Sequence, residues 1–258
     1  PNEYGRKFDF SINSVIEDFQ NKKRMYERSE LARKRQLSSI AHDLRTPLTS
    51  VIGYLEAVIN GIADDEGQKE DYIKIAYEKS IEIKRFTDEL FEMAKIDGEE
   101  LILKPEKLDI NEITRSTLIQ FIPLLKKDCL ELAVEIPETR FMVLFDKNSL
   151  ERIIQNVFQN ALQHGKAGGI LGVSVLEKQA EYSIKIWDRG KGIPEDKIEF
   201  IFDRLFKVDD SRKSEYTGYG LGLAIAKKLC EINNSRITVS SNEISGTEFE
   251  IKILKIRV

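Results

Sequence analysis

The sequence predicts two parts of different fold class: an α-helical hairpin that forms a dimeric four-helix bundle, followed by an α+β sandwich. In the first part, apolar residues recur at spacings of three and four, which is typical of helices packed along a seam. In the second part, strand-like and helical segments mix with glycine loops, and nine of the 15 glycines lie between Gly165 and Gly222. This change in glycine content places the join near Gly98 to Pro105.

The first part contains two heptad-like seams, separated by the loop-forming stretch NGIADDEGQ at residues 60–68. The first seam consists of Leu37, Ala41, Leu44, Leu48, Val51, Leu55 and Val58. The second consists of Ile73, Ala76, Ser80, Ile83, Thr87, Leu90 and Ala94. Because a lone hairpin buries two such narrow stripes poorly, we expect a homodimer. Residues 11–36 are charged and should form a helix that leads into the first seam.

The second part contains six segments with the composition of strands. They are residues 131–136, 141–146, 172–177, 182–187, 236–241 and 247–254. Helical periodicity is found at residues 111–127, 147–164 and 221–232. Because strands and helices do not alternate regularly, we expect the helices to cover one face of a sheet.

Composition argues against several classes of protein. The formal net charge of -4 offers no concentrated basic face, so we expect no nucleic-acid partner. No apolar run reaches the roughly 18 residues that span a membrane. Cys129 and Cys230 lie far apart without the spacing of metal ligands, and we interpret them as reduced thiols.

The stretch IAHDLRTPLTSVIGYL, residues 40–55, places a histidine in a predicted helix. His42 follows the seam residue Ala41 and is therefore rotated about 100° from the buried stripe, so its ring should face solvent. Asp43 is adjacent, and Thr46 lies one turn on, on the same face. Pro47 removes a backbone donor and should bend the helix. The arrangement favours a phosphoryl-accepting site; an accidental surface histidine is the alternative.

Four short motifs follow in the second part: NVFQNA (156–161), DRGKGIP (188–194), FDRLF (202–206) and GYGLGL (218–223). In the last, Gly218, Gly220 and Gly222 come just before an apolar-periodic helix that starts at about Leu223. Backbone amides at a glycine-rich helix start can bind a triphosphate, although a flexible loop is the alternative. The sequence lacks a G-x-x-x-x-G-K-[ST] run, so this is not a P-loop.

Asp188 ends a strand just before the tight turn at Gly190 and Gly192. Its carboxylate could accept a hydrogen bond from the amino group of adenine, or it could simply cap the turn. Asn156 and Asn160 lie one turn apart and share a helix face. Amide oxygens suit Mg²⁺, which also takes phosphate oxygens, although solvated surface asparagines are the alternative.

The segment HDLRTPLT resembles the phosphoacceptor box of sensor histidine kinases, most closely that of vancomycin-resistance sensor kinases. This resemblance implies that ATP phosphorylates His42 and that the phosphoryl group passes to an aspartate of a response-regulator receiver domain. Asp43 would orient the imidazole ring. Thr46 would serve in dephosphorylating the response regulator.

The four later motifs, in their order and spacing, resemble the N, G1, F and G2 boxes of the histidine-kinase catalytic domain, a Bergerat ATP-binding fold. The resemblance runs from about Leu31 to the C-terminus. It implies that Asn160 coordinates Mg²⁺ with Asn156 assisting, and that Asp188 recognises adenine. Residues 208–217 would form a lid over ATP.

In and beside this lid, Lys207, Arg212 and Lys213 could contact phosphates or could be solvated charges. Gln163 stands where many members carry a basic residue that reaches the phosphates, which puts the nucleotide affinity in question. His164 follows it as a pocket wall residue.

The resemblance also implies an organisation for the chain. Residues 1–30 would transmit a signal, 31–98 would dimerise and accept the phosphoryl group, and 99–258 would bind ATP. We expect the cytoplasmic portion of a bacterial inner-membrane sensor whose membrane segments lie outside this sequence. Two rivals stay open: an ATPase of the same fold, whose water-activating Glu is replaced here by Asn156, and a catalytically silent scaffold.

Overall fold

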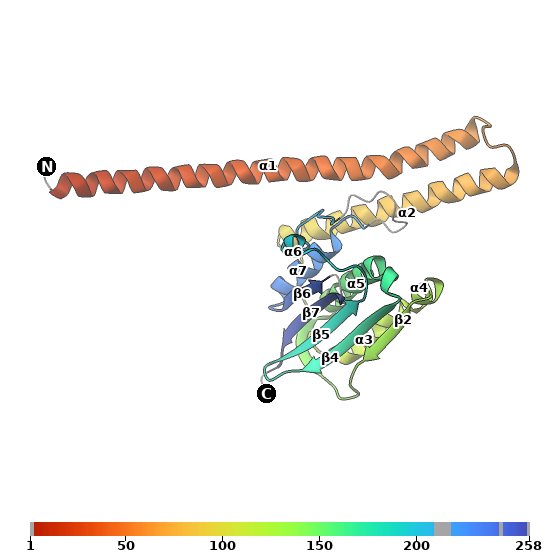
Figure 1. Cartoon of the computed structure of the whole chain (residues 1–258). Coiled ribbons are helices and arrows are strands. Elements are labelled where there is room, and N and C mark those ends of the chain that lie inside the picture. The colour runs from red at the N-terminus through yellow and green to blue at the C-terminus, as the bar shows by residue number, and fades with distance from the viewer. Residues whose placement is uncertain (1–2, 209–217, 243–244, 257–258) are drawn as a thin grey trace. The chain divides into compact units, whose positions relative to one another are not determined.

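The computed structural model describes residues 3–208, 218–242 and 245–256 (Figure 1). The chain forms two compact units, Pro1–Ile83 and Lys84–Val258, which we describe separately. The first unit contains α1 (Glu3–Ile59) and the beginning of α2 (Glu66–Asp97). The helix expected over residues 11–36 is confirmed, because α1 runs without interruption from Glu3 through Pro47.

The helical hairpin turns at residues 60–65, where Gly61 has a φ of 67° that a residue with a side chain rarely adopts. Near this end Tyr54 of α1 and Tyr72 of α2 pack with ring centroids 5.3 Å apart. Much of the predicted seam is uncovered in the single chain: Leu37 is 58% exposed, Leu48 50% and Ile73 51%. These apolar side chains are available to a partner helix.

The second unit contains a five-stranded sheet of order β2-β4-β5-β7-β6. Its strands are β2 (Glu131–Glu135), β4 (Ile170–Glu177), β5 (Glu181–Asp188), β6 (Arg236–Asn242) and β7 (Gly246–Leu254). Only β2 and β4 pair in parallel; the other neighbours in this sheet are antiparallel. A separate two-stranded ladder joins β1 (Pro105–Asp109) to β3 (Met142–Asp146).

One face of the large sheet is covered by helices α3 (Ile110–Ile119), α5 (Lys147–His164) and α7 (Gly222–Ile232), with α5 packed against both others (Figure 1). Asp146 begins α5 by accepting a hydrogen bond from the Ser149 N–H at 2.8 Å. The core between helices and sheet includes Ile153, Val157, Ile186 and Phe249, each at most 1% exposed. The predicted α+β sandwich is confirmed.

One local prediction was wrong, and one strand was missed. The helix expected over 111–127 is divided into α3 and α4 (Ile122–Lys127), because Pro123 lies in the first turn of α4, where its missing N–H does no harm. The join near Gly98 to Pro105 contains the start of β1, which sequence reasoning missed. Its residues, PEKLD, bury only Leu108, so they lack the alternation that identifies a strand.

The last turns of α2 bury a different face from the predicted seam. Phe86 is 0% exposed, Met93 5% and Ile96 3%, whereas the seam residue Ala94 is exposed. These three apolar side chains recur at spacings of seven and three and belong to the core of the second unit. The α2 helix therefore contributes to both units, and the compact units divide within it at Ile83.

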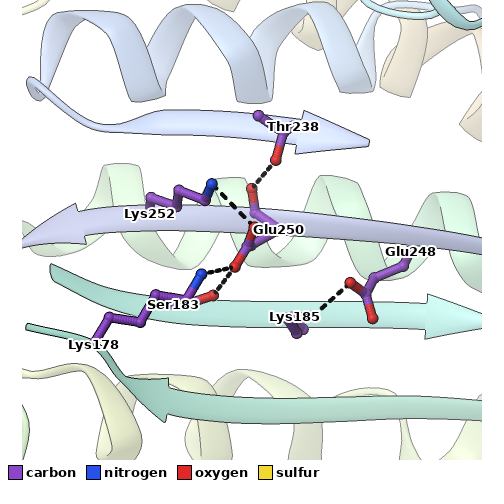
Figure 2. Close-up of polar contacts among 7 residues, drawn as sticks. All are labelled: Lys178, Ser183, Lys185, Thr238, Glu248, Glu250 and Lys252. Carbon is purple, nitrogen blue, oxygen red and sulfur yellow. Dashed lines mark hydrogen bonds and ion pairs between the residues drawn. The ribbon is translucent and has the colours of Figure 1, made fainter. Parts of the chain in front are cut away.

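The other face of the large sheet is polar (Figure 2). Glu250 on β7 accepts hydrogen bonds from Lys178 and from the Ser183 hydroxyl, each at 2.6 Å, and pairs with Lys252 at 3.2 Å. Burial raises the pKa of Glu250, but these three donors outweigh it and lower the pKa to about 2. The face is thus stabilised by charge pairs between strands rather than by a second apolar layer.

Candidate active site

Asp188 lies at the end of β5 and is 3% exposed. Its Oδ1 accepts a hydrogen bond from the Gly190 N–H at 2.8 Å, and the Thr247 N–H also bonds to the carboxylate. Burial raises the pKa of Asp188, although both hydrogen bonds oppose that effect. The carboxylate caps the turn after β5 as the alternative expected, and it does so while buried, at a cost that a solvated cap would avoid.

The C-terminal end of α5 closely approaches this carboxylate. A Cβ atom added to Gly165 would lie 2.4 Å from the Asp188 Cβ, so any side chain there would collide with it. One added to Gly190 would lie 2.5 Å from the His164 carbonyl oxygen. Two glycines thus let the end of α5 and the turn after β5 enclose Asp188.

Asn156 faces the glycine loop from α5. It is 8% exposed, and its Nδ2 has no hydrogen-bond partner among the described residues. A Cβ on Gly222 would lie 3.5 Å from the Asn156 Oδ1, which places this amide beside the start of α7. A buried amide left unpartnered is costly unless a ligand meets it. Asn160 follows one turn later on α5 and is half-buried.

The glycine loop adopts a conformation that requires glycine. Gly220 has a φ of 73°, and an added Cβ would lie 2.7 Å from the Phe206 carbonyl oxygen. The Leu205 N–H donates to the Gly220 carbonyl at 2.9 Å, which ties the FDRLF segment to the loop. A Cβ on Gly218 would lie 2.9 Å from the Gln163 Oε1, so this side chain lies directly against the loop.

The loop leads into α7, which begins at Gly222 and has no side-chain cap at its first turn. The first backbone N–H groups of such a helix lack intrahelical partners, and the helix dipole adds positive potential there. Leu223 is half-buried in this first turn. The helix start therefore supplies donors for an anion next to Asn156.

Some predicted residues are less closely tied to this arrangement. Lys207 Nζ lies 5.7 Å from the centre of the Tyr219 ring, close to the loop. Gly192 has a φ of 70° in the turn after Asp188. Arg212 and Lys213, like most of the predicted lid, lie outside the described residues.

Sequence reasoning missed the polar contacts that hold the Asp188 turn. The Ser241 hydroxyl lies 2.9 Å from the Thr247 hydroxyl, accepts from the Ile193 N–H at 2.8 Å and bonds to the Gly246 carbonyl at 3.0 Å. Gly246 has a φ of 81°, and an added Cβ would lie 2.1 Å from the Asp188 carbonyl oxygen. This glycine, within the stretch SGTEF at residues 245–249, was the signal available in the sequence, but only its close approach to β5 explains it.

The histidine predicted to accept a phosphoryl group lies on α1, in the first unit. The His42 side chain is 67% exposed, as expected, and its Nδ1 lies 3.3 Å from the Asp43 Oδ1. The Thr46 hydroxyl is exposed and lies 3.4 Å from the His42 carbonyl oxygen. This arrangement directs Nδ1, rather than Nε2, to the carboxylate.

The residues in the second unit fit a magnesium–nucleotide complex. Three features lie there: the buried Asp188 carboxylate, the glycine-lined start of α7, and an Asn156 Nδ2 with no hydrogen-bond partner among the described residues, which could donate to a phosphate oxygen. Among the described residues, no three His, Cys, Asp or Glu side chains gather as a metal site. Amide and phosphate oxygens can hold Mg²⁺ without such a cluster. Fold and site together define an ATP-binding domain joined to a helical histidine hairpin.

Known proteins show the same combination. The family "Histidine kinase-, DNA gyrase B-, and HSP90-like ATPase" matches residues 145–257, and the "His Kinase A (phospho-acceptor) domain" matches residues 32–99. The sensor histidine kinase YcbM of Bacillus subtilis is 30% identical over 95% of this chain and 79% of its own. The chain belongs to the sensor histidine kinase family and is a histidine kinase of the two-component type.

Two further proteins extend the comparison. The sensor protein kinase WalK of Staphylococcus aureus is 30% identical over 87% of this chain, which spans 54% of that relative. The structure of histidine kinase ThkA in complex with the response regulator protein TrrA has a TM-score of 0.69 and 23% identity. It covers 84% of this chain and 60% of ThkA, and it shows the shared fold. No helix in the described ranges is long and apolar enough to cross a membrane.

Proposed function

We propose that His42 is the residue phosphorylated by ATP and that its Nε2 is the attacking atom. The main support for this assignment is the exposed His42 ring, whose Nδ1 lies 3.3 Å from the Asp43 Oδ1. A proton held on Nδ1 leaves the Nε2 lone pair available for the γ-phosphorus. As the N–P bond forms, the bond between that phosphorus and the bridging oxygen of ADP breaks. Asp43 offsets the positive charge that develops on the ring.

In this proposal the nucleotide lies between α5, the Asp188 turn and the glycine loop. The Asp188 carboxylate accepts from the exocyclic amino group of adenine, and the amides at the start of α7 donate to phosphate oxygens. Asn160, with Asn156 assisting, would hold Mg²⁺, which neutralises charge on the phosphates when bound. Gln163 contributes a neutral amide beside Gly218, where a basic side chain would add a phosphate contact.

The phosphoryl group then passes from His42 to an aspartate of a response regulator. Support comes from family membership and from ThkA, which is solved with the response regulator protein TrrA. We also propose that the chain dephosphorylates the regulator, with the Thr46 hydroxyl directing water. The direct alternative is that this hydroxyl only bonds to the His42 carbonyl, and the 3.4 Å contact is compatible with both.

A dimer through the helical hairpin completes the proposal. The exposed seam residues Leu48, Leu55 and Ile73 provide an apolar surface that a second copy would cover. The domain limits expected at residues 30 and 98, the attachment to a membrane and the likeness to vancomycin-resistance kinases stay predictions.

Incubation with γ-³²P-labelled ATP tests the phosphorylation site directly. The wild-type protein should gain label that acid removes and base does not, which is characteristic of a phosphoramidate. His42→Gln should gain none, while His164→Gln, the matched control, should still be labelled. Release of free phosphate alone would indicate an ATPase, and no reaction would indicate a silent scaffold. Label that persists on His42→Gln would assign the acceptor elsewhere.

A further inference from the structure

Tyr219 is the aromatic residue within the glycine loop, between Gly218 and Gly220. Its side chain is 8% exposed, and its ring stacks on Phe86 of α2 with centroids 4.0 Å apart and planes 22° from parallel. Phe86 itself is 0% exposed. The loop assigned to the nucleotide is therefore packed against a helix that carries none of the assigned nucleotide ligands.

Two arginine–carboxylate pairs hold the same segment of α2. Arg152 of α5 pairs with Glu92: its Nη2 lies 2.7 Å and its Nε 2.9 Å from the Glu92 Oε2. Arg204 pairs end-on with Asp97: its Nη2 lies 2.6 Å from Oδ1 and its Nη1 lies 2.6 Å from Oδ2. Two-pronged pairs of this kind fix orientation as well as distance.

These anchors lie next to the proposed nucleotide site. Arg152 is one turn before Asn156 on α5, and Arg204 precedes Leu205, whose N–H bonds to the Gly220 carbonyl. Residues 84–97 therefore contact the asparagine helix, the FDRLF segment and the glycine loop within one compact unit. A displacement of this segment would disturb all three.

The physical need for such support follows from the loop itself. Glycines at positions 218, 220 and 222 give the backbone many conformations, and a ligand that binds must restrict them. Packing that restricts the loop in advance lowers that entropic cost and strengthens binding. The Phe86–Tyr219 stack supplies such packing from outside the loop.

We propose that Phe86 is a positioning residue for the nucleotide, acting through Tyr219 to hold the glycine loop ready for ATP. The proposal rests on the assignment of this loop to the nucleotide. Because binding energies are reciprocal, bound nucleotide should in turn strengthen the docking of residues 84–97. The α2 helix is continuous from Glu66, so a rotation of it that withdraws Phe86 would lower ATP affinity.

The test uses the full chain and measures the dissociation constant of Mg·ADP by titration calorimetry. Phe86→Ala should weaken ADP binding by about three- to tenfold, the scale expected for a lost aromatic contact and lost ordering. Phe91→Ala is the matched control: the same change on the same helix at a side chain that is 69% exposed. It should leave ADP affinity within about twofold.

Autophosphorylation adds a readout that general loss of structure would not give. The KM for ATP should rise in Phe86→Ala, while the rate at saturating ATP should change by less than about twofold. Phe86→Tyr, which keeps a ring, should restore wild-type affinity. Tyr219→Ala removes the same stack and also the ring beside Lys207, so it should weaken binding at least as much, and the double variant should be no weaker than Tyr219→Ala alone.

If Phe86→Ala fails to unfold cooperatively on heating, Phe86→Leu replaces it, because leucine keeps apolar volume but not the stack. ADP affinity equal to wild type in the folded variant would overturn the proposal, as would simple additivity with Tyr219→Ala. Failure of the wild-type chain to bind ADP would instead overturn the nucleotide assignment itself. The two failures are thereby distinguished.

Discussion

The Asp43 Oδ1 lies 3.3 Å from the Nδ1 of His42, so adjacent residues on α1 form a contact that selects one ring nitrogen. The carboxylate is more enclosed than the ring, with side-chain exposures of 18% and 67% respectively. An enclosed acid beside an exposed base is the arrangement expected when the base must meet a reagent delivered from elsewhere.

Asp43→Asn should therefore slow autophosphorylation by roughly 10²-fold, the scale of lost acid–base assistance, and leave ADP affinity unchanged. An amide cannot balance the charge that develops on the ring. Initial rates of label incorporation at saturating ATP measure this. Asp88→Asn, which removes an exposed carboxylate paired with Lys84 on α2, is the control. Equal rates for Asp43→Asn and wild type would rule out the orienting role.

Thr46→Ala should retain most autokinase activity but dephosphorylate the response regulator slowly, by about tenfold or more. The reason is that its exposed hydroxyl can direct water, whereas the 3.4 Å contact with the His42 carbonyl is too weak to hold the helix. Time courses with purified phosphorylated regulator decide the matter. Thr46→Ser is the control, since it keeps the hydroxyl. If Thr46→Ala dephosphorylates the regulator at the wild-type rate, the hydroxyl has no role in that reaction and only bonds to the backbone.

Asp188→Asn should abolish measurable nucleotide binding without destabilising the empty protein. Because burial raises the pKa of Asp188 above that of the unfolded chain, the ionised group costs stability at neutral pH, and this cost shrinks as pH falls below the folded pKa towards the unfolded one. A neutral amide avoids that cost but presents different hydrogen-bonding atoms to adenine. Calorimetric titration with ADP and a thermal melt measure the two effects. Unchanged ADP affinity in Asp188→Asn would remove the adenine assignment.

Asn160→Asp should mainly alter the Mg²⁺ dependence of ADP binding.

The hairpin should be dimeric at micromolar concentration, and Leu55→Glu should shift it towards monomer. Leu55 is 41% exposed on the predicted seam, and burying an unpaired carboxylate there is costly. Light scattering coupled to size exclusion measures the mass. Ile62→Glu is the control, because Ile62 is 62% exposed in the turn outside the seam. A monomeric wild-type chain would contradict the dimer.

Glu250→Gln should reduce stability at neutral pH by on the order of 1 kcal/mol, because it removes the charge from three contacts. The pKa of Glu250 falls from 4.5 to about 2 on folding, so its contribution is present above about pH 4.5 and is lost as pH drops towards 2. Urea unfolding at several pH values should give a smaller wild-type–variant difference at pH 3 than at pH 7. Glu248→Gln, which loses one pair with Lys185, should show a smaller effect. A wild-type–variant difference in unfolding free energy that stays constant from pH 7 to pH 3 would contradict the lowered pKa of Glu250.

The sequence by itself determined most of the helices, most of the strands and the residues that we propose carry the chemistry. The ATP-binding fold was identified by the resemblance of the asparagine and glycine motifs to those of a known family. Periodicity placed His42 on the exposed side of α1, a local feature that depends only on spacing along one helix. The same reasoning failed at β1, because PEKLD becomes a strand only by pairing with β3 across the chain.

Only the tertiary structure decided which glycines make room for Asp188 and which face of α2 is buried. Gly165 and Gly246 are needed because α5 and the β6–β7 hairpin approach β5 closely there. Phe86 departs from the predicted seam because it stacks on Tyr219, 133 residues later in the sequence. Burial depends on neighbours that arrive from distant parts of the chain, whereas periodicity records only the element in which a residue lies.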